Sequence, residues 1–198
     1  MDVAFVVDRT RSVGVVNFML LKGFLLQLIG AMHISPDTTH AGVIAFSRKP
    51  TLLSTLADTN KHSNKAFHDH ILSIPVILGR RTFTDKALRL AAQRFFTEKE
   101  GDRPKFPNVL ILFTDGRTNV DSRPFNQIIP LLKVRFKLSV VLLFCPDCWL
   151  SSPSNKKVNS INQKLSRIYR RLIDNLTARI YGLCCPEANK KGGLNSLN

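Results

Sequence analysis

Apolar runs of strand length alternate with helical segments along most of this chain, and this alternation restricts the choice of fold. The runs expected to form strands are 2–7, 40–46, 51–56, 108–114 and 138–144. The segments expected to form helices, with apolar residues at steps of three or four, are 15–32, 64–73, 84–96 and 124–134. Strands separated by such helices favour an α/β fold, doubly wound around a mostly parallel sheet with helices on both faces.

One predicted strand differs from the others because it follows its predecessor after a short turn. Arg48, Lys49 and Pro50 separate the run 40–46 from the run 51–56. A connection this short joins antiparallel neighbours. We therefore expect one short antiparallel strand at an edge of the sheet.

Oxygen-bearing side chains occur where two of the apolar runs end and where one helix begins. Asp8-Arg9-Thr10-Arg11-Ser12 follows the first run, Thr114-Asp115-Gly116 closes the run 108–114, and Thr82-Phe83-Thr84 precedes a helix. The carboxyl ends of parallel strands face a common crevice. Carboxylates and hydroxyls are the ligands that hard divalent cations prefer. The sequence therefore predicts that these three segments meet around one cation.

In these segments the chain resembles a von Willebrand factor type A domain, closest to the A domains of matrilins and type VI collagen chains. That family opens with a strand, an Asp-x-Ser-x-Ser sequence and a helix, which residues 8–12 match with threonine at position 10. Residues 79–84 match its Gly-x-x-Thr-x-Thr-like loop, and residues 113–116 match its strand ending in Thr-Asp-Gly. The order and spacing fit over residues 1 to about 144. The resemblance implies a Rossmann-like α/β fold.

The resemblance also implies a metal-ion-dependent adhesion site, or MIDAS. Carried across, the ligands of the ion, directly or through water, are Asp8, Thr10, Ser12, Thr82 and Asp115. The ion would be Mg²⁺, or Mn²⁺ or Ca²⁺, with one position left open for an acidic group of a protein partner. Such a site binds and performs no chemistry. The chain also lacks the Gly-x-Ser-x-Gly, P-loop and His-Glu-x-x-His sequences, so we do not expect an enzyme.

Arginines flank every proposed ligand segment. They are Arg9, Arg11, Arg80, Arg81 and Arg117. Because a guanidinium cannot lose its charge, this rim lowers the affinity for a divalent cation and attracts an acidic partner. We expect a weak metal site with a partner-binding rim. The alternative is a degenerate site in which arginines have replaced the ion.

The net charge of +15, from 29 Lys+Arg against 14 Asp+Glu, favours acidic partners. By resemblance, these are matrix proteins such as collagen. The metal-independent alternatives are a structural role or binding of a polyanion such as a heparin-like sulfated glycan. Nucleic acid is not expected, because no aromatic stacking platform accompanies the charge. We expect no membrane span. An extracellular location assumes that a leader or upstream part lies outside this chain, and the alternative is the cytoplasm.

The C-terminal part is abbreviated relative to the family pattern. We expect a type A-like domain over 1–185 and a flexible polar tail over 186–198. Cys145 and Cys148, with Cys184 and Cys185, suit disulfides in an extracellular setting, and their connectivity is open; free buried thiols are the alternative. Asn175 lies in an Asn-x-Thr glycosylation sequence, and His68 and His70 are expected to be solvated.

Overall fold

The computed structural model describes residues 1–115, 118–128, 130–132 and 138–143. All of them belong to one compact unit, Met1–Asp147, and a second unit comprises Cys148–Asn198. Several sequence predictions lie outside the described residues and stay predictions. These concern Arg117, the four cysteines, Asn175, the abbreviated C-terminal part and the domain boundary at residue 185.

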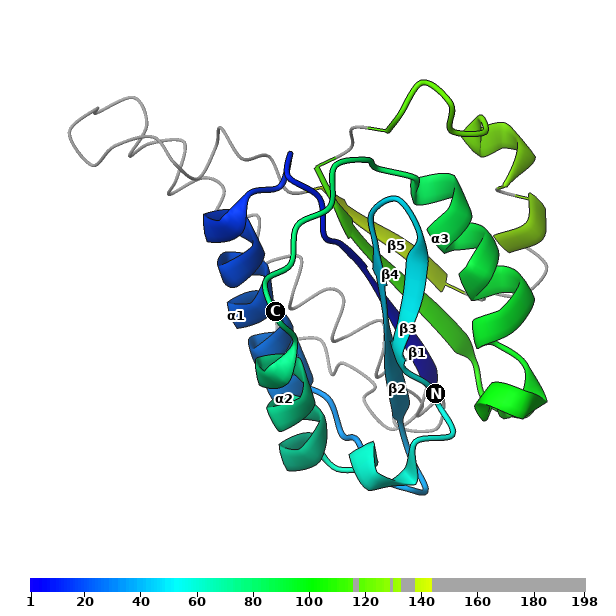
Figure 1. The fold of residues 1–198 in the computed structure, drawn as a ribbon. Helices are drawn as coiled ribbons and strands as arrows, with labels where there is room; N and C mark the ends of the chain where they lie inside the picture. Colours follow the sequence, from blue (N-terminus) through cyan, green and yellow to red (C-terminus); the bar gives the residue numbers. More distant parts are fainter. Residues whose placement is uncertain (116–117, 129, 133–137, 144–198) are drawn as a thin grey trace, which may run out of the picture. The chain divides into compact units, whose positions relative to one another are not determined.

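A five-stranded sheet forms the centre of the first unit (Figure 1). Its strands are β1 (Asp2–Asp8), β2 (His40–Phe46), β3 (Pro50–Ser54), β4 (Asn108–Thr114) and β5 (Leu138–Leu143), in the order β3-β2-β1-β4-β5. β1 is parallel to both β2 and β4, and β4 is parallel to β5. β3 is antiparallel to β2 at one edge. The predicted mixed sheet is therefore confirmed, including its antiparallel edge strand.

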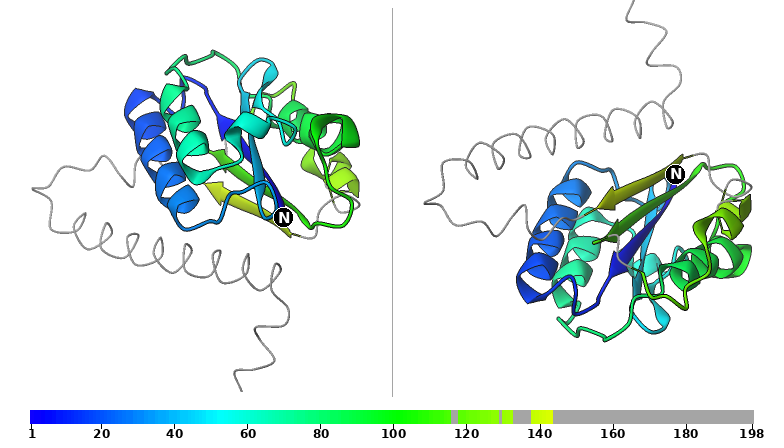
Figure 2. Two further views of the ribbon diagram at one scale, coloured as in Figure 1. Left: turned by 90° about the horizontal axis from the view of Figure 1, so that it is seen from below. Right: turned by 90° about the horizontal axis from the view of Figure 1, so that it is seen from above.

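Helices cover both faces of this sheet. α1 (Val15–Gly30) and α2 (Asn64–Ser73) pack on one face, and α3 (Thr84–Leu90) packs on the other (Figures 1 and 2). Short 3₁₀ turns occur at Thr59–Lys61, Glu98–Glu100 and Phe125–Gln127, and α3 continues as a π-helical turn at Ala91–Phe95. The helix expected over 124–134 is reduced, in the described part, to the last 3₁₀ turn and helical residues 130–132. Pro130 removes a backbone donor from its interior.

The core lies on both sides of the sheet because side chains alternate along each strand. Toward α1 and α2, Phe5 of β1 packs against Phe67 and Phe113, with ring centroids 6.0 and 6.4 Å away. Toward α3, Ala4 and Val6 join a cluster that includes Phe95. Every residue of β1 and of β2 is buried, as expected for parallel strands covered on both faces.

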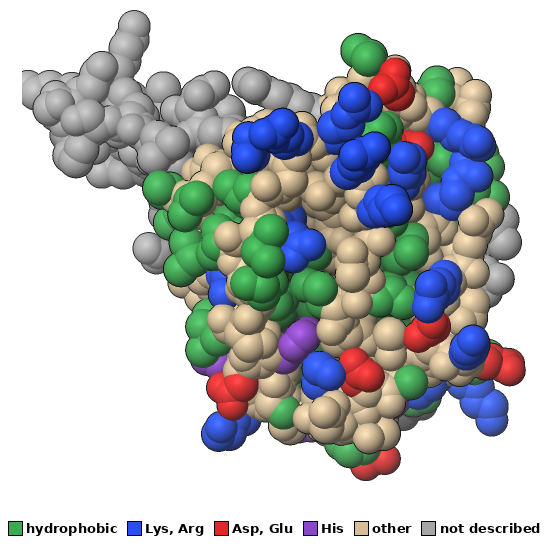
Figure 3. Space-filling model, in the orientation of Figure 1, with side chains coloured by type: hydrophobic (Ala, Val, Ile, Leu, Met, Phe, Trp, Pro, Cys, Tyr) green, Lys and Arg blue, Asp and Glu red, His purple; other side chains and the backbone are tan. Residues whose placement is uncertain are grey.

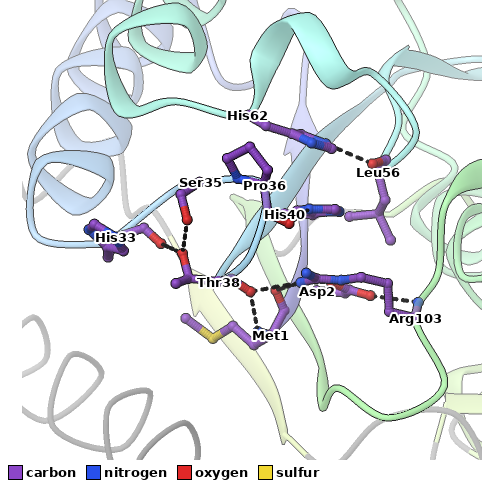
Figure 4. Close-up of polar contacts among 10 residues, drawn as sticks. All are labelled: Met1, Asp2, His33, Ser35, Pro36, Thr38, His40, Leu56, His62 and Arg103. Atoms are coloured by element: carbon purple, nitrogen blue, oxygen red, sulfur yellow. Dashed lines mark hydrogen bonds and ion pairs between the residues drawn. The ribbon is translucent and has the colours of Figure 1, made fainter.

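An ion pair between the buried Asp2 and the half-buried Arg103 closes the edge at which the parallel strands begin (Figure 4). The Arg103 guanidinium donates to Asp2 Oδ1 from Nε at 2.9 Å and from Nη2 at 2.6 Å, while the Arg103 backbone N–H donates to Asp2 Oδ2 at 2.8 Å. Nη2 also donates to the carbonyls of Met1 and Thr38. We call this side of the sheet the amino edge.

Two histidines stack at the amino edge (Figure 4). The rings of His40 and His62 lie 3.7 Å apart, and each side chain is buried, with 9% of the residue exposed. Their Nε2 atoms hydrogen-bond the carbonyls of Pro36 and Leu56 at 2.8 and 2.9 Å. Burial holds the pKa of His40 below its usual range, and the nearby Arg103 charge lowers it further. The hydrogen bond to the Pro36 carbonyl acts in the opposite direction.

Among the residues described, no helix combines the length and the apolar character needed to cross a membrane.

Candidate metal centre

The carboxyl ends of β1 and β4 bring two of the predicted segments together. The strands run parallel with Val7 opposite Phe113, so Asp8 and Thr114 emerge side by side. The Thr114 hydroxyl donates to Asp8 Oδ2 at 2.8 Å. We call this side of the sheet the carboxyl edge. It is the edge at which ligands bind in open α/β sheets.

The loop after β1 is held against the loop that leads to α3. The Arg11 N–H donates to the Gly79 carbonyl at 2.8 Å, and the Gly79 N–H donates to the Arg9 carbonyl at 2.9 Å. A Cβ atom at Gly79 would overlap the side chain of Ser47, so only glycine allows this close approach. Between these contacts, the Thr10 and Ser12 hydroxyls lie 2.9 Å apart.

Thr82 is fixed by the loop that follows β4. The Asn119 N–H donates to the Thr82 carbonyl at 3.0 Å, and the Thr82 N–H donates to Asn119 Oδ1 at 3.4 Å. On the other side, the Phe83 N–H donates to the Ser47 carbonyl of the β2–β3 turn at 3.1 Å. Thr82 therefore lies between the loop after β4 and the β2–β3 turn, and its side chain is buried.

Asp8 is the most deeply buried charged group at this edge. Only 1% of the residue is exposed, and its Oδ1 atom is buried without a hydrogen-bond partner among the described residues. Burial raises the pKa of Asp8 to about 6, hydrogen bonds from Thr10 and Thr114 oppose this rise, and the negative charge of Asp115 adds to it. A buried carboxylate with a free oxygen is costly unless a cation or donor compensates for it.

The residues present fit a hard cation. Asp8, Thr10, Ser12 and Asp115 supply oxygen atoms alone, the ligand type of Mg²⁺, Mn²⁺ and Ca²⁺. Ser12 is exposed and Asp115 is half-exposed, so the site opens to solvent. Among the described residues, no cluster of three or more His, Cys, Asp or Glu side chains could hold a metal ion, either at this site or elsewhere. A metal here would therefore depend on the hydroxyl groups.

Four arginines of the rim are described, and all four lie in the segments that carry the predicted ligands. Arg11, Arg80 and Arg81 are exposed, and Arg9 is half-buried. Arg81 Nη1 pairs with Asp121 Oδ2 at 3.3 Å. Within the described part of the chain, no arginine hydrogen-bonds or pairs with Asp8.

Sequence reasoning missed several residues that position the site. Thr114, within the quoted Thr-Asp-Gly sequence, donates directly to Asp8. Asn119 and Ser122 both hydrogen-bond the backbone of Thr82, which lies 37 and 40 residues before them in the chain. The signal for Thr114 was available, because parallel neighbours place their last residues together. Nothing local in the sequence indicates Asn119 or Ser122.

Comparison with known sequences finds relatives among matrix proteins. The von Willebrand factor type A domain profile matches residues 2–173. Mouse matrilin-2 is 32% identical over 125 residues, which covers 61% of this chain and 13% of matrilin-2. The human collagen alpha-6(VI) chain is 30% identical over 115 residues, covering 58% of this chain and 5% of that protein. This chain thus spans a small part of the length of these relatives.

Comparison with solved structures finds the same fold. Proximal thread matrix protein 1 from the mussel byssus superposes with a TM-score of 0.63 at 19% identity, over 71% of this chain and 37% of that one. Another structure of that protein, with a TM-score of 0.61, has a zinc-occupied MIDAS motif. At this level of identity, the likeness supports the fold alone.

Proposed function

We propose that this chain, which belongs to the von Willebrand factor type A domain family, is an extracellular adhesion module. It binds an acidic group of a matrix protein through a divalent cation and catalyses no reaction. The observation that carries this proposal is the buried Asp8 carboxylate, whose Oδ1 atom has no hydrogen-bond partner among the described residues. A bound cation would compensate for that charge.

Five residues would hold the ion: Asp8, Thr10, Ser12, Thr82 and Asp115. The ion would supply a positive charge to which a carboxylate oxygen of the partner binds. The hydrogen bond between the Thr10 and Ser12 hydroxyls supports a shared orientation of these two side chains. The exposed arginines Arg11, Arg80 and Arg81, with Arg9 and Arg117, would attract the acidic partner and weaken the metal site.

The relatives named matrilin and collagen support a matrix setting and collagen-like partners. In that compartment, disulfides among Cys145, Cys148, Cys184 and Cys185 would persist, and Asn175 would be available for glycosylation. These assignments follow from the proposed location and share its test. Disulfide pairing and glycan occupancy can both be read by mass spectrometry of the chain expressed behind a secretion signal.

Calorimetric titration of Mg²⁺ and Mn²⁺ into the 198-residue chain tests the metal site. We expect binding in the millimolar range or tighter, lost in Asp8→Asn and in Asp115→Asn. Asp121→Asn is the matched control, because this exposed carboxylate pairs with Arg81 of the rim. An absence of heat with the unaltered chain at millimolar metal would favour the degenerate alternative.

Binding to immobilised collagen, with and without EDTA, tests the adhesion role separately. We expect EDTA to abolish binding and Mg²⁺ to restore it. Collagen binding that persists in EDTA would instead favour a metal-independent structural module.

A further inference from the structure

Cationic side chains gather at the carboxyl edge well beyond the arginines that flank the metal ligands. Figure 3 shows Lys and Arg side chains crowded over the loops at this edge, in the same orientation as Figure 1. The exposed members are Arg11, Arg48, Lys49, Arg80, Arg81, Lys86 and Arg123. They come from four segments: the loop after β1, the β2–β3 turn, the start of α3 with its preceding loop, and the loop after β4.

Most of these cations have no carboxylate partner in the described part of the chain. Arg81 is the exception, because it pairs with Asp121. Elsewhere, four described cations are paired: Arg103 with Asp2, Lys61 with Asp58, Lys65 with Asp69 and Arg94 with Glu100. Of the other four described cations there, only Lys99 and Lys105 are exposed, so the carboxyl edge holds most of the exposed, unpaired cations in the described part of the chain. Unpaired cations on one face attract a polyanion.

The segments that carry these cations are held in place. The Arg9 N–H donates to the Phe46 carbonyl at 2.8 Å, and the Phe83 N–H donates to the Ser47 carbonyl at 3.1 Å, so the turn bearing Arg48 and Lys49 is tied to both neighbouring loops. Lys86 Nζ lies 3.7 Å from the centre of the Phe83 ring. A preorganised set of charges loses less entropy on binding than one on a free tail.

We propose that this edge binds a sulfated glycan chain along a path over Arg11, Arg48, Lys49, Lys86 and Arg123, independently of the metal. A linear polyanion reaches all four segments at once, whereas a single acidic group of a protein reaches only the metal site. Sulfate groups stay ionised, and guanidinium groups bind their oxygens in pairs. Phe83 is buried, so this edge offers no described aromatic platform for stacking the bases of a nucleic acid.

Affinity for a heparin-derived oligosaccharide, measured across a salt series with the full chain, tests the proposal. Arg48→Ala/Lys49→Ala should weaken binding about tenfold near physiological salt and reduce the slope of log K against log[salt] by about 2. The matched control is Lys99→Ala/Lys105→Ala, which removes the same charge from exposed, unpaired positions between α3 and β4. The control should bind within about twofold of the unaltered chain.

Equal weakening by the two double variants would overturn the proposal, since net charge alone would then explain binding. So would equal affinity for polyglutamate or for a single-stranded oligonucleotide, because the surface would not select sulfate. EDTA and Asp8→Asn should leave heparin affinity unchanged; loss of binding in either would locate the glycan at the metal site. Failure of the metal titration would leave this result unaffected, so the two proposals fail separately.

Discussion

Asp2 and Asp8 are the first and last residues of β1, and both are buried, yet their surroundings differ. Asp2, at the amino edge, accepts hydrogen bonds from the guanidinium and the backbone of Arg103. Asp8, at the carboxyl edge, accepts hydrogen bonds from Thr114 and Thr10, but no cation pairs with it and its Oδ1 atom has no hydrogen-bond partner among the described residues. One strand thus carries a compensated charge at one end and an uncompensated charge at the other.

The two ends of β1 therefore have different roles: the pair at Asp2 stabilises the fold, and the carboxylate of Asp8 is suited to binding a ligand. Arg103 joins the start of β1 to the loop before β4 and to Thr38, so it stabilises the fold. The raised pKa of Asp8, about 6 against an ordinary 3.8, means that its ionised form destabilises the metal-free fold near pH 7. At about 1.4 kcal/mol per pKa unit, the cost is about 3 kcal/mol. A ligand that neutralises Asp8 would recover that energy.

The largest expected effect comes from breaking the compensated pair. Arg103→Ala leaves the Asp2 carboxylate buried without its cation, so the free energy of unfolding should fall by about 3–5 kcal/mol. Denaturant unfolding measures this. Arg94→Ala is the control, because the pair of Arg94 with Glu100 is more exposed and should contribute less than about 1 kcal/mol. Similar losses in both variants would mean that the amino edge is not specially stabilised by its ion pair.

The second prediction addresses the uncompensated charge. Asp8→Asn keeps an oxygen that can accept from Thr114 but removes the buried negative charge. In EDTA at pH 7, the variant should be about 3 kcal/mol more stable than the unaltered chain, and Mg²⁺ should no longer raise its melting temperature. Asp121→Asn, on the exposed rim, should change stability by less than about 0.5 kcal/mol. If Asp8→Asn instead lowers the melting temperature in EDTA, then the ionised Asp8 does not destabilise the metal-free fold.

The third prediction uses the opposite pH dependences of the two edges. The pKa of Asp8 is raised, so the stability contributed there increases as pH falls from 6 toward 4. The pKa of His40 is lowered, so the stability contributed there is lost as pH falls below 6.5. Below pH 6, hydrogen-exchange protection factors should therefore fall around β2 and the Pro36 loop, but not around Thr114.

His40→Gln separates these contributions. Its amide N–H can still donate to the Pro36 carbonyl, but the side chain does not titrate next to Arg103, Asp2 and His62. The acid-induced loss of protection at the amino edge should disappear in this variant. If it persists unchanged, then protonation of His40 is not its cause.

The sequence predicted the sheet well because its parallel strands are buried on both faces and read as continuous apolar runs. β2 and β4 begin and end at the predicted residues. α2 does as well, since Ser63 caps its first turn by accepting from the Ala66 N–H at 3.2 Å. The predicted helix over 84–96 was continuous, but the structure ends the α-helix at Leu90 and continues with a π-helical turn.

The polar interactions were less predictable, because they join residues far apart along the chain. The convergence of Asp8 with the end of β4 follows from parallel register. The pairing of Asp2 with Arg103 and the stacking of His40 on His62 depend on loop paths that no local pattern specifies. The apolar periodicity that identifies strands carries no information about these side-chain partners, and metal binding by the predicted ligands stays a prediction.

The smallest predicted effect tests whether the rim acts through its electric field. Arg11 is exposed and lies between Thr10 and Ser12, so its charge repels a cation held by those hydroxyls. Arg11→Gln should tighten Mg²⁺ binding about twofold to threefold at low ionic strength, measured by calorimetry, and the gain should vanish near 0.5 M salt, where screening is about 4 Å long. Lys105→Gln, in the loop before β4 on the amino edge, should leave the affinity unchanged. A gain that survives high salt would mean that Arg11 acts by direct contact, so that the carboxyl edge would be partly compensated by its own arginine, as the amino edge is by Arg103.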